Sequence, residues 1–145
     1  MMVYLESFRY SPRSSFRTVV SGQRVPIELT SLGRAYLRAL PQQEQIRELH
    51  VIAERRSRAW PQLEADIRAS FTELETDGFC IVRWQPGVAA VAASILLPGL
   101  APHALNMSIA SSEPLPALRR TLGPWLLDLR RRCLADLEAS LLPEN

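Results

Sequence analysis

The sequence contains no lysine, and all 17 of its basic residues are arginine. Schiff-base chemistry and the Walker type of phosphate site both need a lysine, so neither is available to this chain. The formal net charge of +2 is too small to indicate a nucleic-acid-binding surface. Two arginine runs, at residues 55–58 and 130–132, lie among acidic residues and are interpreted as solvated helix faces.

Cysteine and histidine are scarce as well. Cys80 and Cys133 lie far apart without a C-x-x-C spacing, which indicates neither a zinc site nor a disulfide framework. Each is expected to be a buried structural thiol. His50 and His103 are the only histidines and show no metal-ligand spacing. No metal and no cofactor is therefore expected.

Long apolar runs are also missing. No segment approaches the roughly 18 apolar residues of a membrane helix, and the N-terminus does not follow a secretory signal pattern. Hydrophobic residues make up 47% of the 145 residues and charged residues 22%, as in ordinary globular proteins. We therefore expect one cytoplasmic domain with a real core and no membrane contact.

The periodicity of apolar residues changes several times along the chain. It predicts strands over residues 1–8 and 16–21, then helices from Thr30–Ser31 to Leu40, over 42–56 and over 60–77. Three strands follow at 79–84, 88–97 and 103–109. The last predicted helix covers 115–141, interrupted or kinked near Gly123–Pro124. Its predicted buried stripe consists of Leu118, Leu122, Trp125, Leu126, Leu129, Cys133 and Leu137.

This order of elements indicates an α+β fold, with an antiparallel sheet flanked by helices. The nearly continuous apolar run over 88–97 is typical of a central strand that is covered on both faces.

The segment VPIELTSLGRAYLRALP, residues 25–41, contains an unusual glycine. Thr30 and Ser31 are good helix caps, but Gly33 lies in the first helical turn, where alanine would be favoured by about 1 kcal/mol. A glycine there suggests that another group approaches the backbone. That group is either a small polar ligand at the helix N-terminus or a packed part of the protein, and the residues leave both interpretations open.

Four segments resemble, in order and approximate spacing, motifs of the IclR family of bacterial transcription regulators. Residues 22–35, GQRVPIELTSLGRA, resemble G-x-x-x-P-L-x-x-T-A-x-G-K-A, and residues 77–79, DGF, resemble the end of R-x-x-G-Y/F. Residues 86–93, PGVAAVAA, are similar to P-G-x-x-x-I-A-A, and residues 104–108, ALNMS, to A-L-N-V-S.

The resemblance implies that residues 1–145 form the family's C-terminal effector-binding domain, with a GAF-like or profilin-like fold. It implies a domain that begins later than the family's usual copy and contains no DNA-binding part. Its partners would be a small organic effector, carrying a carboxylate or an aromatic group, and further copies in a homodimer or homotetramer. DNA would be contacted only through a separate winged helix-turn-helix. The alternative is an oligomerisation module with a degenerate pocket.

The resemblance also implies an effector pocket. Its expected residues are Thr30, Ser31, Leu32, Gly33, Val82, Arg83, Trp84, Ala90, Asn106 and Ser108. Asn106 and Ser108 point to the same sheet face because strand side chains alternate; a solvent-facing strand is the alternative. We hypothesise that Arg83 anchors a carboxylate and that Trp84 covers an apolar ligand group. The alternative for Arg83 is an exposed position at a strand end.

No enzyme is expected, because a nucleophile elbow, a triad, paired acids and a metal motif are all missing.

Overall fold

The computed structural model describes residues 2, 3, 22 and 24–142. Two short strands, β1 (Met2–Val3) and β2 (Arg24–Val25), pair with each other and precede three helices, α1 (Ser31–Ala39), α2 (Gln42–Arg56) and α3 (Trp60–Asp77). Strands β3 (Cys80–Gln85), β4 (Val88–Ile95) and β5 (His103–Ala110) follow, and α4 (Leu115–Leu141) closes the described chain. The strand predicted at 16–21, and most of the one predicted at 1–8, lie outside the described residues.

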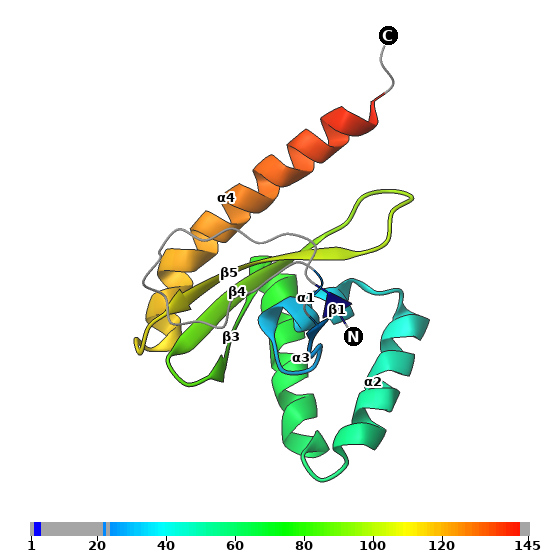
Figure 1. Cartoon of the computed structure of the whole chain (residues 1–145), viewed down its shortest axis with the longest axis vertical. Coiled ribbons are helices and arrows are strands. Elements are labelled where there is room, and N and C mark those ends of the chain that lie inside the picture. Colours follow the sequence, from blue (N-terminus) through cyan, green and yellow to red (C-terminus); the bar gives the residue numbers. More distant parts are fainter. Residues whose placement is uncertain (1, 4–21, 23, 143–145) are drawn as a thin grey trace.

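The sheet has the order β3–β4–β5 and is antiparallel throughout. Helix α4 covers one face, while α1 and α3 lie on the other side (Figure 1). As predicted, β4 is the central strand, and its residues from Ala89 to Ala93 are all buried. The α+β prediction is thus confirmed.

Helix α1 begins with the predicted cap. The Thr30 hydroxyl accepts a hydrogen bond from the Gly33 amide at 3.1 Å and donates one to the carbonyl oxygen of Pro26 at 2.9 Å. A side-chain carbon on Gly33 would lie far inside van der Waals contact with the backbone of Ile27. The group that approaches this glycine is therefore the protein's own chain, so the packing interpretation of Gly33 is correct.

Helix α3 packs through the predicted face, with Leu63, Ile67 and Phe71 buried. Gly78 ends it in the left-handed conformation, at φ 81°, as expected for a glycine C-cap. Around these side chains lies the core between the helices, which also contains Ile27, Leu37, Leu40 and Ile52.

Helix α4 passes through Pro124 without the interruption that is one of the two predicted alternatives. It also buries only part of the predicted stripe. Leu118, Leu122 and Leu126 pack on the sheet, whereas Trp125, Leu129 and Leu137 are 60%, 39% and 40% exposed. For Leu137 the reason is visible in Figure 1, where the helix extends well past the sheet and its C-terminal end has no sheet surface to pack against. Trp125 is exposed for another reason, because its neighbour Leu126 takes the position that faces the sheet.

Three further expectations can be checked. Cys80 is buried as predicted, but Cys133 is half-exposed. Arg55 and Arg56 are more than a solvated face, because both pair with the buried carboxylate of Glu28, at 3.0 and 2.8 Å. Within the described chain, none of the helices combines the length and apolarity that crossing a bilayer requires.

Candidate functional site

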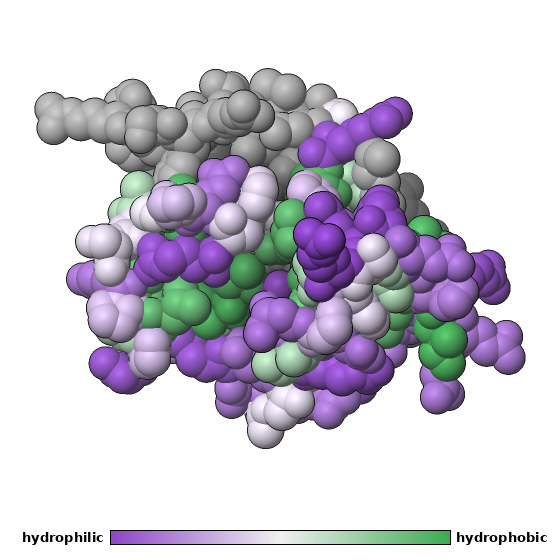
Figure 2. Space-filling model, turned by 90° about the horizontal axis from the view of Figure 1, so that it is seen from below, coloured by the Kyte–Doolittle hydropathy of each residue, from purple (hydrophilic) through white to green (hydrophobic). Residues whose placement is uncertain are grey.

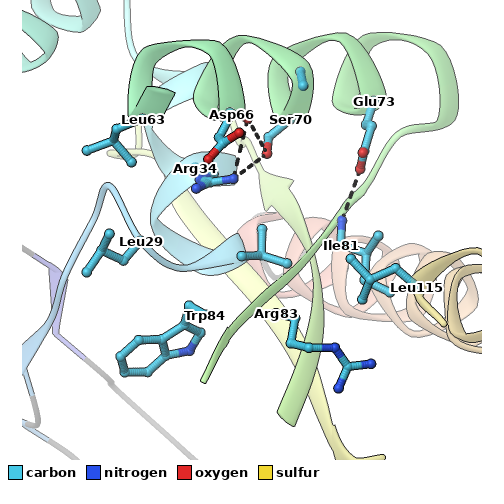
Figure 3. A pocket seen from close by; sticks show the side chains of 12 residues that line it. Leu29, Arg34, Leu63, Asp66, Ser70, Glu73, Ile81, Arg83, Trp84 and Leu115 are labelled. Atoms are coloured by element: carbon cyan, nitrogen blue, oxygen red, sulfur yellow. Dashed lines mark hydrogen bonds between the residues drawn. The ribbon is translucent and has the colours of Figure 1, made fainter. Parts of the chain in front are cut away.

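A pocket of about 410 Å³ lies between α3 and the edge strand β3 (Figure 3). This volume falls in the range typical of small-molecule sites. Arg34 of α1 and Leu115 of α4 complete its wall. The lining residues are Leu29, Arg34, Leu63, Asp66, Ala69, Ser70, Glu73, Ile81, Val82, Arg83, Trp84 and Leu115. Figure 2 views the molecule from below and shows apolar groups reaching the surface between polar ones.

Three of the ten predicted site residues, Val82, Arg83 and Trp84, line this pocket. The other seven do not. The sheet residues among these seven nevertheless lie in line with the pocket. Val82 pairs with Ala90, and Ala90 pairs with Ser108, all on the α1 side of the sheet. Asn106 lies in the next row of that face, opposite Ala92.

Most of the predicted site residues at the start of α1 make their contacts within the protein. The Thr30 hydroxyl serves as the helix cap, Gly33 contacts the Ile27 backbone, and Leu32 is buried. Ser31 is the exception: it is 1% exposed, and its hydroxyl has no hydrogen-bond partner among the described residues. An unsatisfied buried hydroxyl is uncommon in folded proteins.

Asn106 and Ser108 do share a face, as predicted, and contact each other. The Asn106 amide donates to the Ser108 hydroxyl at 3.3 Å. Asn106 is half-buried and Ser108 exposed, so this pair lies at the solvent edge of the sheet face.

The Arg83 guanidinium turns away from the centre of the pocket (Figure 3). Its terminal nitrogens donate to two backbone carbonyls beyond β5, those of Ser111 and, at 2.5 Å, Glu113. Trp84 is 42% exposed and lies on the side of Leu29. In this arrangement Arg83 fastens the end of β3 to the segment before α4.

Sequence reasoning missed the most buried charge of the pocket, Arg34, which is 8% exposed. Its Nε donates to the carbonyl oxygen of Glu28 at 3.1 Å, and its Nη1 to the Ser70 hydroxyl at 3.0 Å and the Asp66 carbonyl at 3.4 Å. Burial lowers the pKa of the guanidinium, against smaller opposing effects of Cys80, Asp66 and Glu73.

Apolar periodicity does not separate Arg34 from Arg38, one turn later on α1, although Arg34 stands at the basic position of the motif matched by residues 22–35. Arg38 is half-exposed and pairs with Glu75 at 2.5 Å, as an ordinary surface arginine does. Only the packing of α3 onto α1 encloses the first and leaves the second at the surface.

The acidic residues of the pocket have partners of their own. The Glu73 carboxylate accepts hydrogen bonds from the Ile81 amide at 3.1 Å and from Arg119 at 2.8 Å. The Asp66 carboxylate accepts from the Gln62 side chain at 2.9 Å. Across the described chain, no three metal-ligating side chains come together.

A second hollow of about 310 Å³ lies near the C-terminal ends of α1 and α3, next to Arg38, Leu74, Leu96 and Arg130. None of the predicted site residues lines it.

No protein-family model and no curated protein matches the chain. Several solved structures do. An IclR-family transcriptional regulator from Brucella abortus matches with a TM-score of 0.83 and 24% identity, covering 97% of this chain and 52% of its own. A proposed transcriptional regulator from Rhodococcus sp. RHA1 matches with a TM-score of 0.69 and 29% identity, covering 87% of this chain and 52% of its own.

The inducer-binding domain of PobR from Acinetobacter, solved with 3-hydroxybenzoic acid, matches with a TM-score of 0.59 and 20% identity, covering 86% of this chain and 77% of its own. The chain thus spans about half the length of the first two proteins. All three are described as regulators or as part of one. The resemblance seen in four short segments is confirmed in three dimensions: the chain has the fold of the IclR-family transcriptional regulators.

Proposed function

We propose that this chain is the ligand-sensing domain of a bacterial transcription regulator of the IclR family. The observation that carries the proposal is the pocket beside β3, which combines a ligand-sized volume with both apolar and charged side chains in its lining. The inducer-binding domain of PobR, which has the same fold, was solved with an aromatic acid, and this supports a small organic effector here. The regulator would act in the cytoplasm.

The effector would contact Val82, Arg83 and Trp84 directly. The remaining predicted residues, Thr30, Ser31, Leu32, Gly33, Ala90, Asn106 and Ser108, would form the sheet and helix framework behind this edge. Among them Ser31 is distinguished by a buried hydroxyl without a partner in the described residues.

Sensing would work by population shift. An effector that binds between α3 and β3 would favour one arrangement of those elements and, with it, one arrangement of the copies in a homodimer or homotetramer. That arrangement would set the spacing of winged helix-turn-helix domains, the only parts that would contact DNA.

One observation favours a second function, that of an oligomerisation module with a degenerate pocket. Helix α4 presents Trp125, Leu129, Leu137 and Leu141 to solvent, all at least 39% exposed. An exposed apolar stripe of this kind is typical of a surface that another chain covers.

Two measurements on the purified chain separate these functions. Native mass spectrometry would reveal a co-purified small molecule, and thermal-shift assays with 3-hydroxybenzoate and other small organic acids would report binding as a rise in Tm. A ligand-dependent Tm supports sensing. If no compound raises Tm while light scattering shows a stable dimer, the result supports the oligomerisation module instead.

A further inference from the structure

Arg34 differs from the other arginines that the fold encloses. Arg119 is 23% exposed and pairs with Glu73 and Asp77, and the half-exposed Arg38 pairs with Glu75. Arg34 is more deeply buried than either, yet within the described residues it forms no ion pair. A buried charge without a counter-ion is costly, so its retention calls for a function.

The hydrogen bonds of Arg34 fix its guanidinium without neutralising it. All three acceptors are uncharged: the carbonyl oxygens of Glu28 and Asp66, and the Ser70 hydroxyl. They occupy Nε and both N–H groups of Nη1. Nη2 has no partner among the described residues, and Arg34 is part of the pocket lining. A positively charged donor is thus held in place with two unused N–H groups.

The neighbouring acids do not balance this charge at short range. Glu73 is neutralised by Arg119 at 2.8 Å, and the Asp66 carboxylate is turned toward Gln62. Arg83 is a poorer anchor than the sequence suggested, because an anion would have to displace two carbonyl oxygens from its terminal nitrogens.

Apolar side chains also line the pocket, and these could contact the apolar part of a ligand. Leu29, Leu63, Trp84 and Leu115 all line it, and its volume of about 410 Å³ accommodates a compact organic molecule. Figure 3 shows Leu63 near Arg34 at one end of the pocket, and Leu29 and Trp84 on the side below them.

We infer that Arg34 is the residue that binds the carboxylate of a small organic acid in this pocket, while Trp84 and the leucines contact its apolar part. This inference rests on the proposed sensing function and assigns its specificity to Arg34 instead of Arg83. A carboxylate at Nη2 supplies the missing counter-charge, and it binds to a guanidinium that is already oriented.

Arginine side-chain NMR on the ¹⁵N-labelled full chain tests this assignment. The probes are 3-hydroxybenzoate, benzoate and pyruvate, each titrated beside its uncharged amide. The Nε signal of Arg34, identified by its loss in Arg34→Lys, should shift with at least one acid and with none of the amides. Arg34→Gln should weaken binding of that acid at least about tenfold, and Arg34→Lys less. Arg38→Gln, one turn away on the same helix, should bind as the parent does.

Four outcomes would overturn the inference. In the first, the Arg83 signal shifts and that of Arg34 does not. In the second, a folded Arg34→Gln protein binds the acid unchanged. In the third, acids and amides bind equally well, which would leave the sensing function intact while removing Arg34 from it. If no probe shifts any arginine signal, the inference falls as well, and the sensing function then depends on whether a neutral effector raises Tm.

Discussion

The two faces of the sheet bury different kinds of side chain. Beneath α4 the core is wholly apolar, with Phe79, Val91 and Leu126 among its buried members. On the α1–α3 side lie all of the buried polar or charged residues of the described chain, namely Glu28, Thr30, Ser31, Arg34 and Ser70. Because buried polar groups stabilise a fold only when they are fully satisfied, the α4 face is best understood as support and the other face as the functional side.

Each side of the sheet also contains a glycine that another part of the protein approaches closely, but the approaching groups differ. Gly33 is pressed against the Ile27 backbone, whereas Gly123 of α4 is pressed against the ring of Phe79. A backbone segment held by the Thr30 cap and the Arg34 hydrogen bonds cannot move away alone. An aromatic ring can tilt, although in a close-packed core it does so at a cost.

The largest effect is therefore expected from Gly33→Ala. Its new methyl group would separate α1 from residues 26–30, and we expect a loss of more than about 4 kcal/mol in the free energy of unfolding, measured by denaturant titration. Gly123→Ala should cost about 1–3 kcal/mol, the usual range for overpacking against a side chain. Equal losses in the two variants would contradict the distinction between a rigid and a yielding neighbour.

The next largest effect is expected from Leu126→Ala, which empties the centre of the α4 face. Leu126 is fully buried, so truncation should lower the free energy of unfolding by about 3 kcal/mol. If this face is only support, the affinity for an organic acid, measured by calorimetry on the folded variant, should stay within twofold of the parent. A large loss of affinity at low temperature, where the variant is fully folded, would assign the α4 face a part in binding.

The sequence also predicts the two sides of the sheet to different extents. The helix and strand boundaries at Thr30, Gly78 and Gly87 follow from local cap and turn chemistry, which acts over a few residues and is written in the sequence. Apolar periodicity correctly gave Leu118, Leu122 and Leu126. It was wrong for Trp125, because periodicity does not show which side of a broad apolar stripe faces the sheet, and the neighbouring Leu126 is the residue that packs there.

The site depends on contacts between distant segments and was harder to predict. Val82, Arg83 and Trp84 are expected at the pocket through the resemblance to the IclR family, and they do line it. Arg34 could not be placed there, since its burial arises from Ser70 and Asp66, more than thirty residues away. The ion pairs of Glu28 could not be predicted either, because its partners Arg55 and Arg56 belong to a run interpreted as a solvated helix face.

The third prediction concerns the pH dependence of stability that arises from the ion pairs of Glu28 with Arg55 and Arg56. Burial raises the pKa of Glu28, but hydrogen bonds and the charges of Arg55 and Arg56 outweigh it, so the folded-state pKa lies below the ordinary 4.5. A depressed pKa adds stability above the unfolded-state value, and this stability is lost as the pH falls through the folded-state value. Glu28→Gln should therefore cost about 2 kcal/mol at pH 7 and progressively less below pH 4.5.

Urea titrations of the parent and Glu28→Gln across this pH range measure the difference. Glu64→Gln is the matched control, since Glu64 pairs with Arg68 on the surface of α3 and its loss should cost no more than about 0.5 kcal/mol. A cost for Glu28→Gln that stays constant down to the acid transition would show that the charge of Glu28 is not what stabilises the fold.

The smallest effect on stability is expected from Trp84→Ala, on the functional side, with Trp125→Ala as its control on α4. Both side chains are substantially exposed, at 42% and 60%, so each variant should change the free energy of unfolding by about 0.5 kcal/mol or less. Only Trp84 lines the pocket, and its removal takes away an apolar surface for the ligand. Binding of an organic acid should weaken about tenfold in Trp84→Ala and remain unchanged in Trp125→Ala, as measured by calorimetry. The reverse result would move the binding surface from the edge of β3 to α4.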